Sequence, residues 1–177
     1  RSLALPGAWW TYMESLFAGI YALLGIDEAL STEMASRIRS RVLNPGNFSM
    51  YPDALQVLQE CRRRGYRNWL LSNHFPELED ILSAHGVHDS FDGFVISANI
   101  GWEKPNSGIF MAALTAAGNP ADCFMVGDNP SADIDGAKRM GIPAILIQRK
   151  AGKALSPELL PPDFTCGCLT DVLNFIK

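Results

Sequence analysis

Residues 123–147, CFMVGDNPSADIDGAKRMGIPAILI, hold two short apolar runs on either side of a longer mixed segment. The runs at 123–126 and 144–147 are continuous rather than alternating, which is typical of strands buried on both faces of a parallel sheet. We predict a helix over 132–140 between them. A strand, a helix and a second strand with short connections form the repeating unit of an α/β protein.

The same alternation extends back to about residue 52. The predicted strands are 69–71, 94–96, 123–126 and 144–147, and the predicted helices are 52–64, 76–85, 107–117 and 132–140. The Pro-rich segment 151–163 is predicted to be a loop, and 169–176 a closing helix. The pattern therefore predicts a three-layer sheet with helices on both faces.

The first part of the chain has a different pattern. Residues 8–26 carry one charge, Glu14, so a signal peptide or a membrane anchor is one interpretation of this stretch. The turn-forming Pro6-Gly7 pair, the charge inside the run and apolar residues at helical spacing favour an ordinary helix instead. A second helix, with Ser31 or Thr32 as N-cap, follows to about residue 42. We therefore expect a helical hairpin over 8–43, without a strand.

Composition limits the classes of function. The chain has 177 residues, 47% hydrophobic and 19% charged, which suits one domain with a sizeable core. Fifteen Lys and Arg against nineteen Asp and Glu give a net charge of −4, which argues against nucleic-acid binding. Four cysteines, Cys61, Cys123, Cys166 and Cys168, are too few for a disulfide scaffold. We expect reduced thiols, a cytoplasmic location and no membrane partner.

Polar clusters follow the predicted strands, at the edge where parallel sheets bind ligands. The stretches LLSN at 70–73, GWEKPNSGIF at 101–110 and MVGDNPSADIDGAKRMGI at 125–142 occur in this order. Together they resemble the haloacid dehalogenase-like (HAD) hydrolase superfamily, most of whose members are Mg²⁺-dependent phosphatases. The resemblance implies a Rossmann-like core, over 48–177, and a small helical cap, over 1–47.

The resemblance assigns roles to three residues around a phosphoryl group. Ser72 would hold a phosphoryl oxygen, and Asn73 would orient the loop or the nucleophile. Lys104 would neutralise phosphate charge. The alternatives are that Ser72 and Asn73 cap the following helix, and that Lys104 is a solvated lysine paired with Glu103.

Asp128 and Asp133 resemble the metal-binding motif of the superfamily. Mg²⁺ prefers hard oxygen ligands and keeps several waters, so one or two carboxylates suffice. Asp128 would be the ligand and Asp133 a supporting or water-mediated one, while Gly127 would allow a tight turn. The alternative, fair for Asp135, is that these acids complement a helix N-terminus.

One motif of the superfamily has no counterpart here. Members begin with a strand that ends in Asp-x-Asp-x-Thr, whereas the first aspartate of this chain is Asp27, inside the hairpin. The first, central strand would lie between 69–71 and 123–126, so those strands would present unpaired edges. We expect a truncated fragment that lacks its nucleophile and is inactive alone, and the unpaired edges favour self-association through the open sheet.

For the intact protein the resemblance implies a phosphomonoesterase that acts on a small phosphorylated metabolite through an aspartyl-phosphate. Trp10 and Met13 of the cap would contact the substrate, unless they form the core of the cap. Two other functions stay open. One is a non-catalytic HAD-fold binding or scaffold protein, and the other is a phosphomutase or phosphonate hydrolase with the same core motifs.

Overall fold

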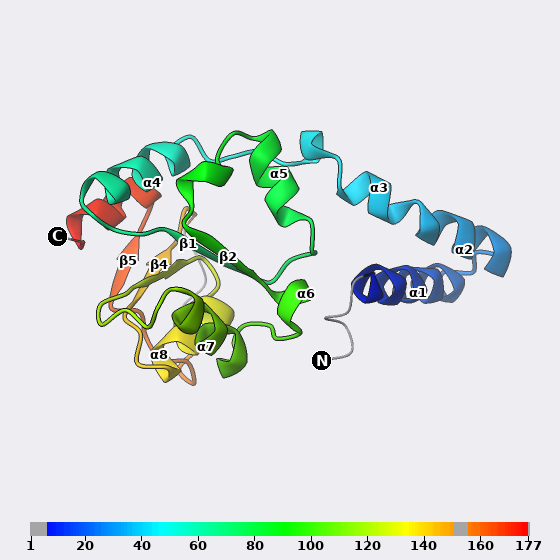
Figure 1. The fold of residues 1–177 in the computed structure, drawn as a ribbon. Coiled ribbons are helices and arrows are strands. Elements are labelled where there is room, and N and C mark those ends of the chain that lie inside the picture. Colours follow the sequence, from blue (N-terminus) through cyan, green and yellow to red (C-terminus); the bar gives the residue numbers. More distant parts are fainter. Residues whose placement is uncertain (1–6, 151–155, 177) are drawn as a thin grey trace.

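The computed structural model describes residues 7–150 and 156–176 (Figure 1). The strands are β1 (Trp69–Ser72), β2 (Gly93–Ile96), β3 (Met125–Gly127), β4 (Ala144–Ile147) and β5 (Phe164–Cys166). The α-helices are α1 (Ala8–Leu23), α2 (Glu28–Ser36), α3 (Ile38–Val42), α4 (Ala54–Arg63), α5 (Leu78–Ala84), α6 (Ser97–Ile100), α7 (Ser107–Ala116) and α8 (Gly136–Arg139). Short 3₁₀ or π turns are η2 (Pro45–Asn47), η3 (His88–Ser90), η4 (Pro130–Asp135) and η5 (Leu169–Asn174).

All strand pairs in the described residues are parallel, which confirms the predicted α/β class. β1 pairs with β2, and β4 lies between β3 and β5. We call β1–β2 the first half-sheet and β3–β4–β5 the second half-sheet. β5 was not predicted, because a three-residue segment after a Pro-rich loop has no periodicity of its own. Its strand character comes from pairing with β4.

Side chains alternate between the two faces of these strands, which produces three layers. Leu71 and Leu146 pack with α7, η4 and α8 on one face. On the other face Leu70 packs against α5, and Ile145 packs against η5. Figure 1 shows α7 and α8 below the strands, and α4 and α5 above them. The predicted covering of both faces is therefore confirmed.

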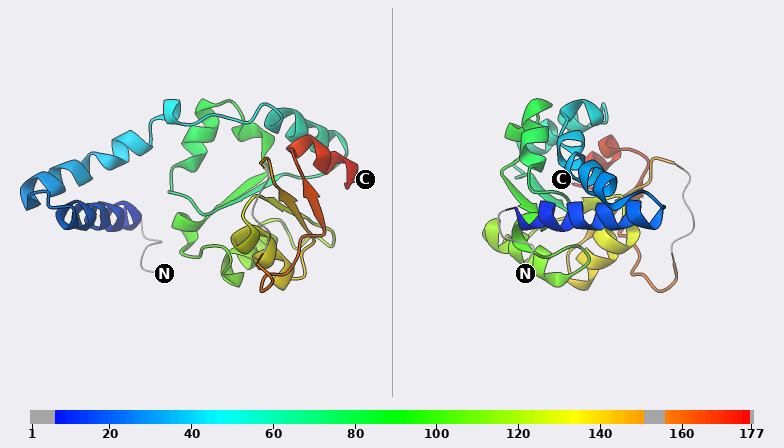
Figure 2. Two further views of the ribbon diagram at one scale, coloured as in Figure 1. Left: turned by 180° about the vertical axis from the view of Figure 1, so that it is seen from behind. Right: turned by 90° about the vertical axis from the view of Figure 1, so that its right-hand side faces the viewer.

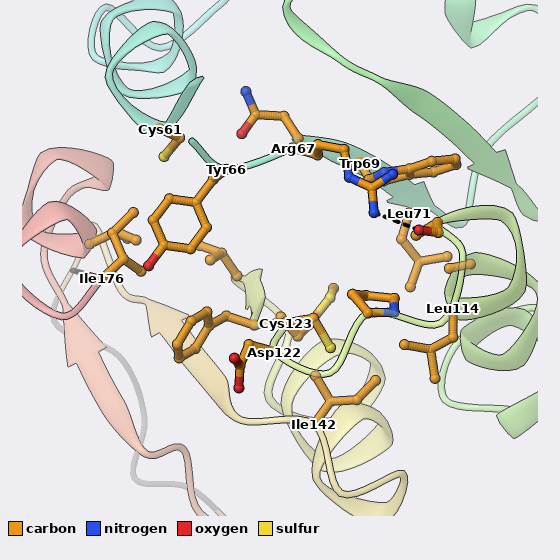
Figure 3. A pocket seen from close by; sticks show the side chains of 18 of the residues that line it. Cys61, Tyr66, Arg67, Trp69, Leu71, Leu114, Asp122, Cys123, Ile142 and Ile176 are labelled. Atoms are coloured by element: carbon orange, nitrogen blue, oxygen red, sulfur yellow. Dashed lines mark hydrogen bonds between the residues drawn. The ribbon is translucent and has the colours of Figure 1, made fainter. Parts of the chain in front are cut away.

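A cavity separates the two half-sheets. β1 and β3 do not pair in the described part of the chain. Between them lies a cavity of about 350 Å³ with mostly apolar walls from β1, α7, η5 and the segment that leads into β3 (Figure 3). We call it the interstrand cavity. It lies at the position where the sequence predicts that a central strand is lacking.

Several predicted element ends need correction. Asp27, rather than Ser31 or Thr32, is the N-cap of α2, since its carboxylate accepts from the Leu30 amide at 2.9 Å. The predicted helix 132–140 begins as the π-type turn η4, and the predicted closing helix is the 3₁₀ turn η5. The third strand begins at Met125, two residues later than predicted. In the predicted loop 151–163, residues 151–155 lie outside the described residues.

The first three helices project from the core as a hairpin (Figure 2). Its base is attached through Trp10, which is 4% exposed and donates from Nε1 to both carboxylate oxygens of Glu77 at 2.9 Å. Among the described residues, no helix has both the length and the apolar character needed to cross a membrane. The four cysteines are free thiols, as predicted.

Candidate active site

Lys104 connects the carboxyl ends of the two half-sheets. It lies in the loop between α6 and α7, and its side chain is 10% exposed. Nζ donates to the backbone carbonyl of Leu71 in β1 at 2.8 Å and to Oδ1 of Asp133 in η4 at 2.6 Å. The alternative pairing of Lys104 with Glu103 does not occur. An ammonium group has three N–H donors, so one remains for a further acceptor.

Asn73 fixes the loop that carries Lys104. Its Oδ1 accepts from the Lys104 amide at 2.8 Å, and its Nδ2 donates to the Lys104 carbonyl at 2.9 Å. Both polar ends of one amide side chain therefore hold one residue of the neighbouring loop. Of the two roles suggested for Asn73, this geometry matches orientation of the loop.

Asp133 is the buried partner of Lys104. Its Oδ2 accepts from the Asn129 amide at 2.9 Å, and the residue is 5% exposed. Gly127 makes this position possible, because a Cβ there would lie 2.4 Å from Oδ2 of Asp133. Gly127 ends β3 without a positive φ. The expected role in a tight turn therefore stays a prediction, and the structure adds a second requirement at this position, which is space for the Asp133 side chain.

Asp128 differs from Asp133 in exposure. It follows β3 directly, is exposed, and has no hydrogen bond or ion pair among the described residues. Beside it, the Asn129 side chain caps η4 by accepting from the Ser131 and Ala132 amides at 3.0 and 2.9 Å. Asn129 was not predicted as a site residue, although an Asn before Pro and Ser is a recognisable N-cap signal. It keeps η4 in place and leaves the Asp128 carboxylate available.

Ser72 is the last residue of β1, one position from the carbonyl that Lys104 contacts. Its hydroxyl makes no hydrogen bond within 7–150 or 156–176, so the alternative role as a helix cap does not occur there. Close by, burial lowers the pKa of His74 from its ordinary value, which favours a neutral imidazole.

Asp135 has a structural role. Its carboxylate accepts from Arg139 Nε at 2.7 Å and from the Leu160 amide at 3.0 Å. The hydrogen bond from Arg139, followed by the one from Leu160, lowers the pKa of Asp135. Asp133 and Asp135 therefore have different partners, Lys104 for the first and Arg139 with the Leu160 amide for the second.

The carboxylates at the carboxyl ends of the half-sheets could supply some of the ligands that a metal ion needs, but not all of them. The described residues contain no group of three His, Cys, Asp or Glu side chains arranged as metal ligands. Mg²⁺ is commonly held by one or two carboxylates, with water and substrate phosphate completing its shell. The exposed Asp128 fits that requirement, whereas both oxygens of Asp133 already accept hydrogen bonds.

Trp10 and Met13 lie in α1, at the base of the helical hairpin. Trp10 packs on Phe75, with ring centroids 6.0 Å apart, and Met13 packs against the same cluster. These contacts fit the alternative in which the two residues form a packed core. Contact with substrate stays a prediction for both.

Comparison with known proteins identifies the family. A family model described as haloacid dehalogenase-like hydrolase matches residues 9–141. The chain belongs to this family. It is 34% identical to the phosphoserine phosphatase of Thermus thermophilus, over 96% of this chain and 73% of that protein. It is 30% identical to human haloacid dehalogenase-like hydrolase domain-containing protein 3, over 87% of this chain and 58% of that protein.

Solved structures agree on the fold of this HAD-like chain. The HAD-hydrolase YfnB from Bacillus subtilis, solved bound to magnesium, superposes with a TM-score of 0.75 at 17% identity. The match covers 93% of this chain and 71% of YfnB. The fold class is therefore that of the HAD family, as the sequence resemblance implied.

Proposed function

We propose that this chain carries the phosphate-binding and magnesium-binding part of a phosphomonoesterase that acts on a small phosphorylated metabolite. The observation that carries the proposal is the position of Lys104, which is held by the Leu71 carbonyl and by Asp133 and keeps one N–H donor for a further acceptor. Ser72, the residue after Leu71, ends the same strand. A relative named as a phosphoserine phosphatase supports this reaction class.

In this proposal the chain's own residues bind and orient the phosphoryl group. The remaining N–H of Lys104 and the Ser72 hydroxyl donate to two phosphoryl oxygens. Asn73 fixes Lys104 before substrate arrives, so less reorganisation is needed at the moment of reaction. A buried ammonium placed this way stabilises the charge that develops on the equatorial oxygens.

Asp128 would hold Mg²⁺, and Asp133 would support it while it positions Lys104. The bound ion would neutralise phosphate charge and orient the transferring group. Asp128 is exposed and Asp133 is buried, which suits these two tasks. A metal ligand must be accessible to the ion and its waters, whereas a positioning group must be held in one place.

The nucleophile would be a carboxylate that these residues do not supply. Its oxygen would attack phosphorus as the ester P–O bond breaks and the leaving alkoxide takes a proton. Water would then hydrolyse the aspartyl-phosphate, releasing phosphate and the carboxylate. The 177-residue chain alone would therefore bind phosphate and Mg²⁺ without turnover.

Phosphate binding tests the proposal without requiring turnover. We expect inorganic phosphate to raise the thermal unfolding midpoint relative to chloride at equal ionic strength, and Mg²⁺ to increase the effect. Lys104→Met and Ser72→Ala should remove the phosphate-dependent shift. Lys150→Met, at an exposed lysine after β4, is the matched control and should retain it.

Two outcomes would count against the proposal. If phosphate does not raise the unfolding midpoint of the wild-type chain, the alternative of a HAD-fold binding or scaffold protein is favoured. Hydrolysis of p-nitrophenyl phosphate by the purified chain, removed by Asp128→Asn, would keep the phosphatase function but contradict the missing nucleophile.

A further inference from the structure

The short loop between β1 and α5 runs from the candidate site to the base of the helical hairpin. It begins with Asn73, whose side chain holds the backbone of Lys104 at 2.8 and 2.9 Å. In its middle the His74 amide donates to the hydroxyl oxygen of Ser97, a buried residue of α6, at 3.1 Å. It ends with Glu77, the N-cap residue of α5. Because the core holds this loop at both ends and in the middle, the loop has little freedom to change the distance between Asn73 and Glu77.

Glu77 contacts two helices of the hairpin at once. The indole Nε1 of Trp10, in α1, donates to both carboxylate oxygens at 2.9 Å. Nη2 of Arg39, in α3, donates to Oε1 at 2.7 Å. The Arg39 guanidinium also lies 5.6 Å from the centroid of the Trp10 ring, within the range of a cation–π contact. We call these three side chains the Glu77 cluster, and it joins three segments that are far apart in the sequence.

Apolar side chains make up much of the remaining junction between hairpin and core. Within α1, all of which the structure describes, Trp10 is the one buried residue. The ring centroids of Trp10 and Trp9 lie 6.0 and 6.4 Å from the centroid of Phe75 in the loop. Burial of apolar surface is non-directional, so many angles between hairpin and core would bury similar areas. A hydrogen bond, in contrast, weakens steeply when its angle departs from linearity. The apolar contacts therefore attach the hairpin, whereas the Glu77 cluster favours one angle.

We propose that Glu77 is a positioning residue, which sets the angle of the helical hairpin relative to Asn73 and Lys104. Its carboxylate holds α1 and α3, and the loop that carries it holds Asn73 and, through Asn73, the backbone of Lys104. The angle of the hairpin is thus defined relative to the carboxyl end of β1, where the candidate site lies. The inference goes beyond the proposed function, because it concerns the free chain and holds whether or not phosphate binds.

Residual dipolar couplings of backbone amides test the angle directly, because they report the orientation of each N–H bond in a common frame. In the wild-type chain we expect the couplings of α1 and α2 to fit the alignment of α4 and α7 in the core. In Glu77→Gln the new side chain has one acceptor oxygen instead of two, and its NH₂ group faces the donors of Trp10 or Arg39. The hairpin should then move relative to the core, so its couplings should fall about twofold while its chemical shifts stay helical.

The Trp10 indole gives a second signature, and its N–H resonance is identified as the one that Trp10→Phe removes. Hydrogen exchange of this N–H should be about tenfold faster in Glu77→Gln, because its acceptor is lost, whereas exchange of the buried Ile145 amide should not change. Equal acceleration of both would mean general destabilisation and would count against the proposal. Asp80→Asn is the matched control, at an exposed carboxylate of α5 without a hydrogen bond or ion pair among the described residues. It should alter neither exchange nor couplings.

A second pair of variants decides the matter if Glu77→Gln does not fold. Arg39→Met removes one donor of the Glu77 cluster, at a side chain that is 52% exposed. Arg41→Met is its control, since the Arg41 guanidinium, on the same helix, has no hydrogen bond or ion pair within the described ranges. We expect smaller hairpin couplings for Arg39→Met alone, and no further decrease when Arg39→Met is added to Glu77→Gln. Wild-type hairpin couplings that do not fit the core alignment, unchanged couplings in Glu77→Gln, or equal effects of Arg39→Met and Arg41→Met would overturn the proposal.

Discussion

The two half-sheets meet differently at their two ends. At the carboxyl ends a buried ammonium joins the Leu71 carbonyl to the Asp133 carboxylate, at 2.8 and 2.6 Å. Toward the amino ends the same half-sheets are separated by the apolar interstrand cavity. The first junction depends on a few exact polar contacts, and the second lacks packing. Removing the charge at the carboxyl ends should therefore lower the free energy of unfolding. Adding apolar volume at the amino ends should raise it.

Loss of the ammonium group should have the largest effect. Lys104→Met leaves Asp133 buried without its cation, and breaking a buried pair typically costs about 3–5 kcal/mol. The free energy of unfolding from urea denaturation measures the change. The double variant Lys104→Met with Asp133→Asn should recover most of it, because no uncompensated charge remains. Equal destabilisation of the single and double variants would contradict this account.

Crowding the same junction should have a smaller effect. Gly127→Ala places a methyl group 2.4 Å from Asp133 Oδ2, so we expect a loss of about 2–3 kcal/mol, typical of overpacking. Gly19→Ala in α1 is the matched control, since nothing lies within 4 Å of its added Cβ. Thermal and urea unfolding should show the control as neutral or slightly stabilised. A neutral Gly127→Ala would show that Asp133 can move without cost.

A second polar contact near the carboxyl ends has a pH signature. Arg149, after β4, donates to Asp53 before α4 at 2.8 and 3.1 Å, and Asp53 also accepts from the Leu169 amide. These contacts, the hydrogen bond from Arg149 first, lower the pKa of Asp53 from its ordinary value of 3.8. A carboxyl with a lowered folded-state pKa stabilises the fold above its unfolded-state pKa, and this contribution is lost as pH falls through the folded-state pKa.

Asp53→Asn should therefore cost about 1–2 kcal/mol near neutral pH. The difference from wild type should be constant above the ordinary pKa and should disappear as the pH falls below the lowered one. Urea unfolding at a series of pH values measures this. Glu158→Gln, at an exposed carboxylate with no hydrogen bond or ion pair among the described residues, controls for loss of charge alone. A pH-independent difference would mean that Asp53 acts through packing.

Filling the cavity should produce the smallest effect and the opposite sign. Ala113→Leu adds apolar volume to the cavity wall, and we expect a gain of about 1 kcal/mol. Ala116→Leu, at an exposed position of the same helix, should change stability by less than about 0.5 kcal/mol. If Ala113→Leu destabilises the protein and Ala116→Leu does not, the residues that line the cavity cannot move to accept a larger side chain.

Local pattern was sufficient to predict most elements. β4 occurs at the predicted residues 144–147, because a continuous apolar run between Pro143 and Gln148 has no competing interpretation. The N-cap of α2 was predicted incorrectly, since Asp27, Ser31 and Thr32 are all good caps and only the chain path selects one. Ser31 is instead buried inside the helix, with its hydroxyl donating to the Ile26 carbonyl.

For the site, residue types were predictable but partners were not. Sequence order placed Ser72, Lys104, Asp128 and Asp133 after strands, and the structure has them at the carboxyl ends of the half-sheets. The pairing of Lys104 with Asp133, 29 residues apart, could not be read from spacing. Nor could the need for Gly127, because the side chain that requires its space comes from η4.

The sequence by itself determined the α/β class, the strand ends that carry polar residues and the family to which the chain belongs. These features follow from periodicity and from residue types at fixed spacing, which are local properties. Only the tertiary structure decided that Asp133 positions Lys104, that Asp135 does not, that β5 is a strand, and that a cavity separates β1 from β3. Each of these depends on contacts between distant segments, whose energies outweigh local preference.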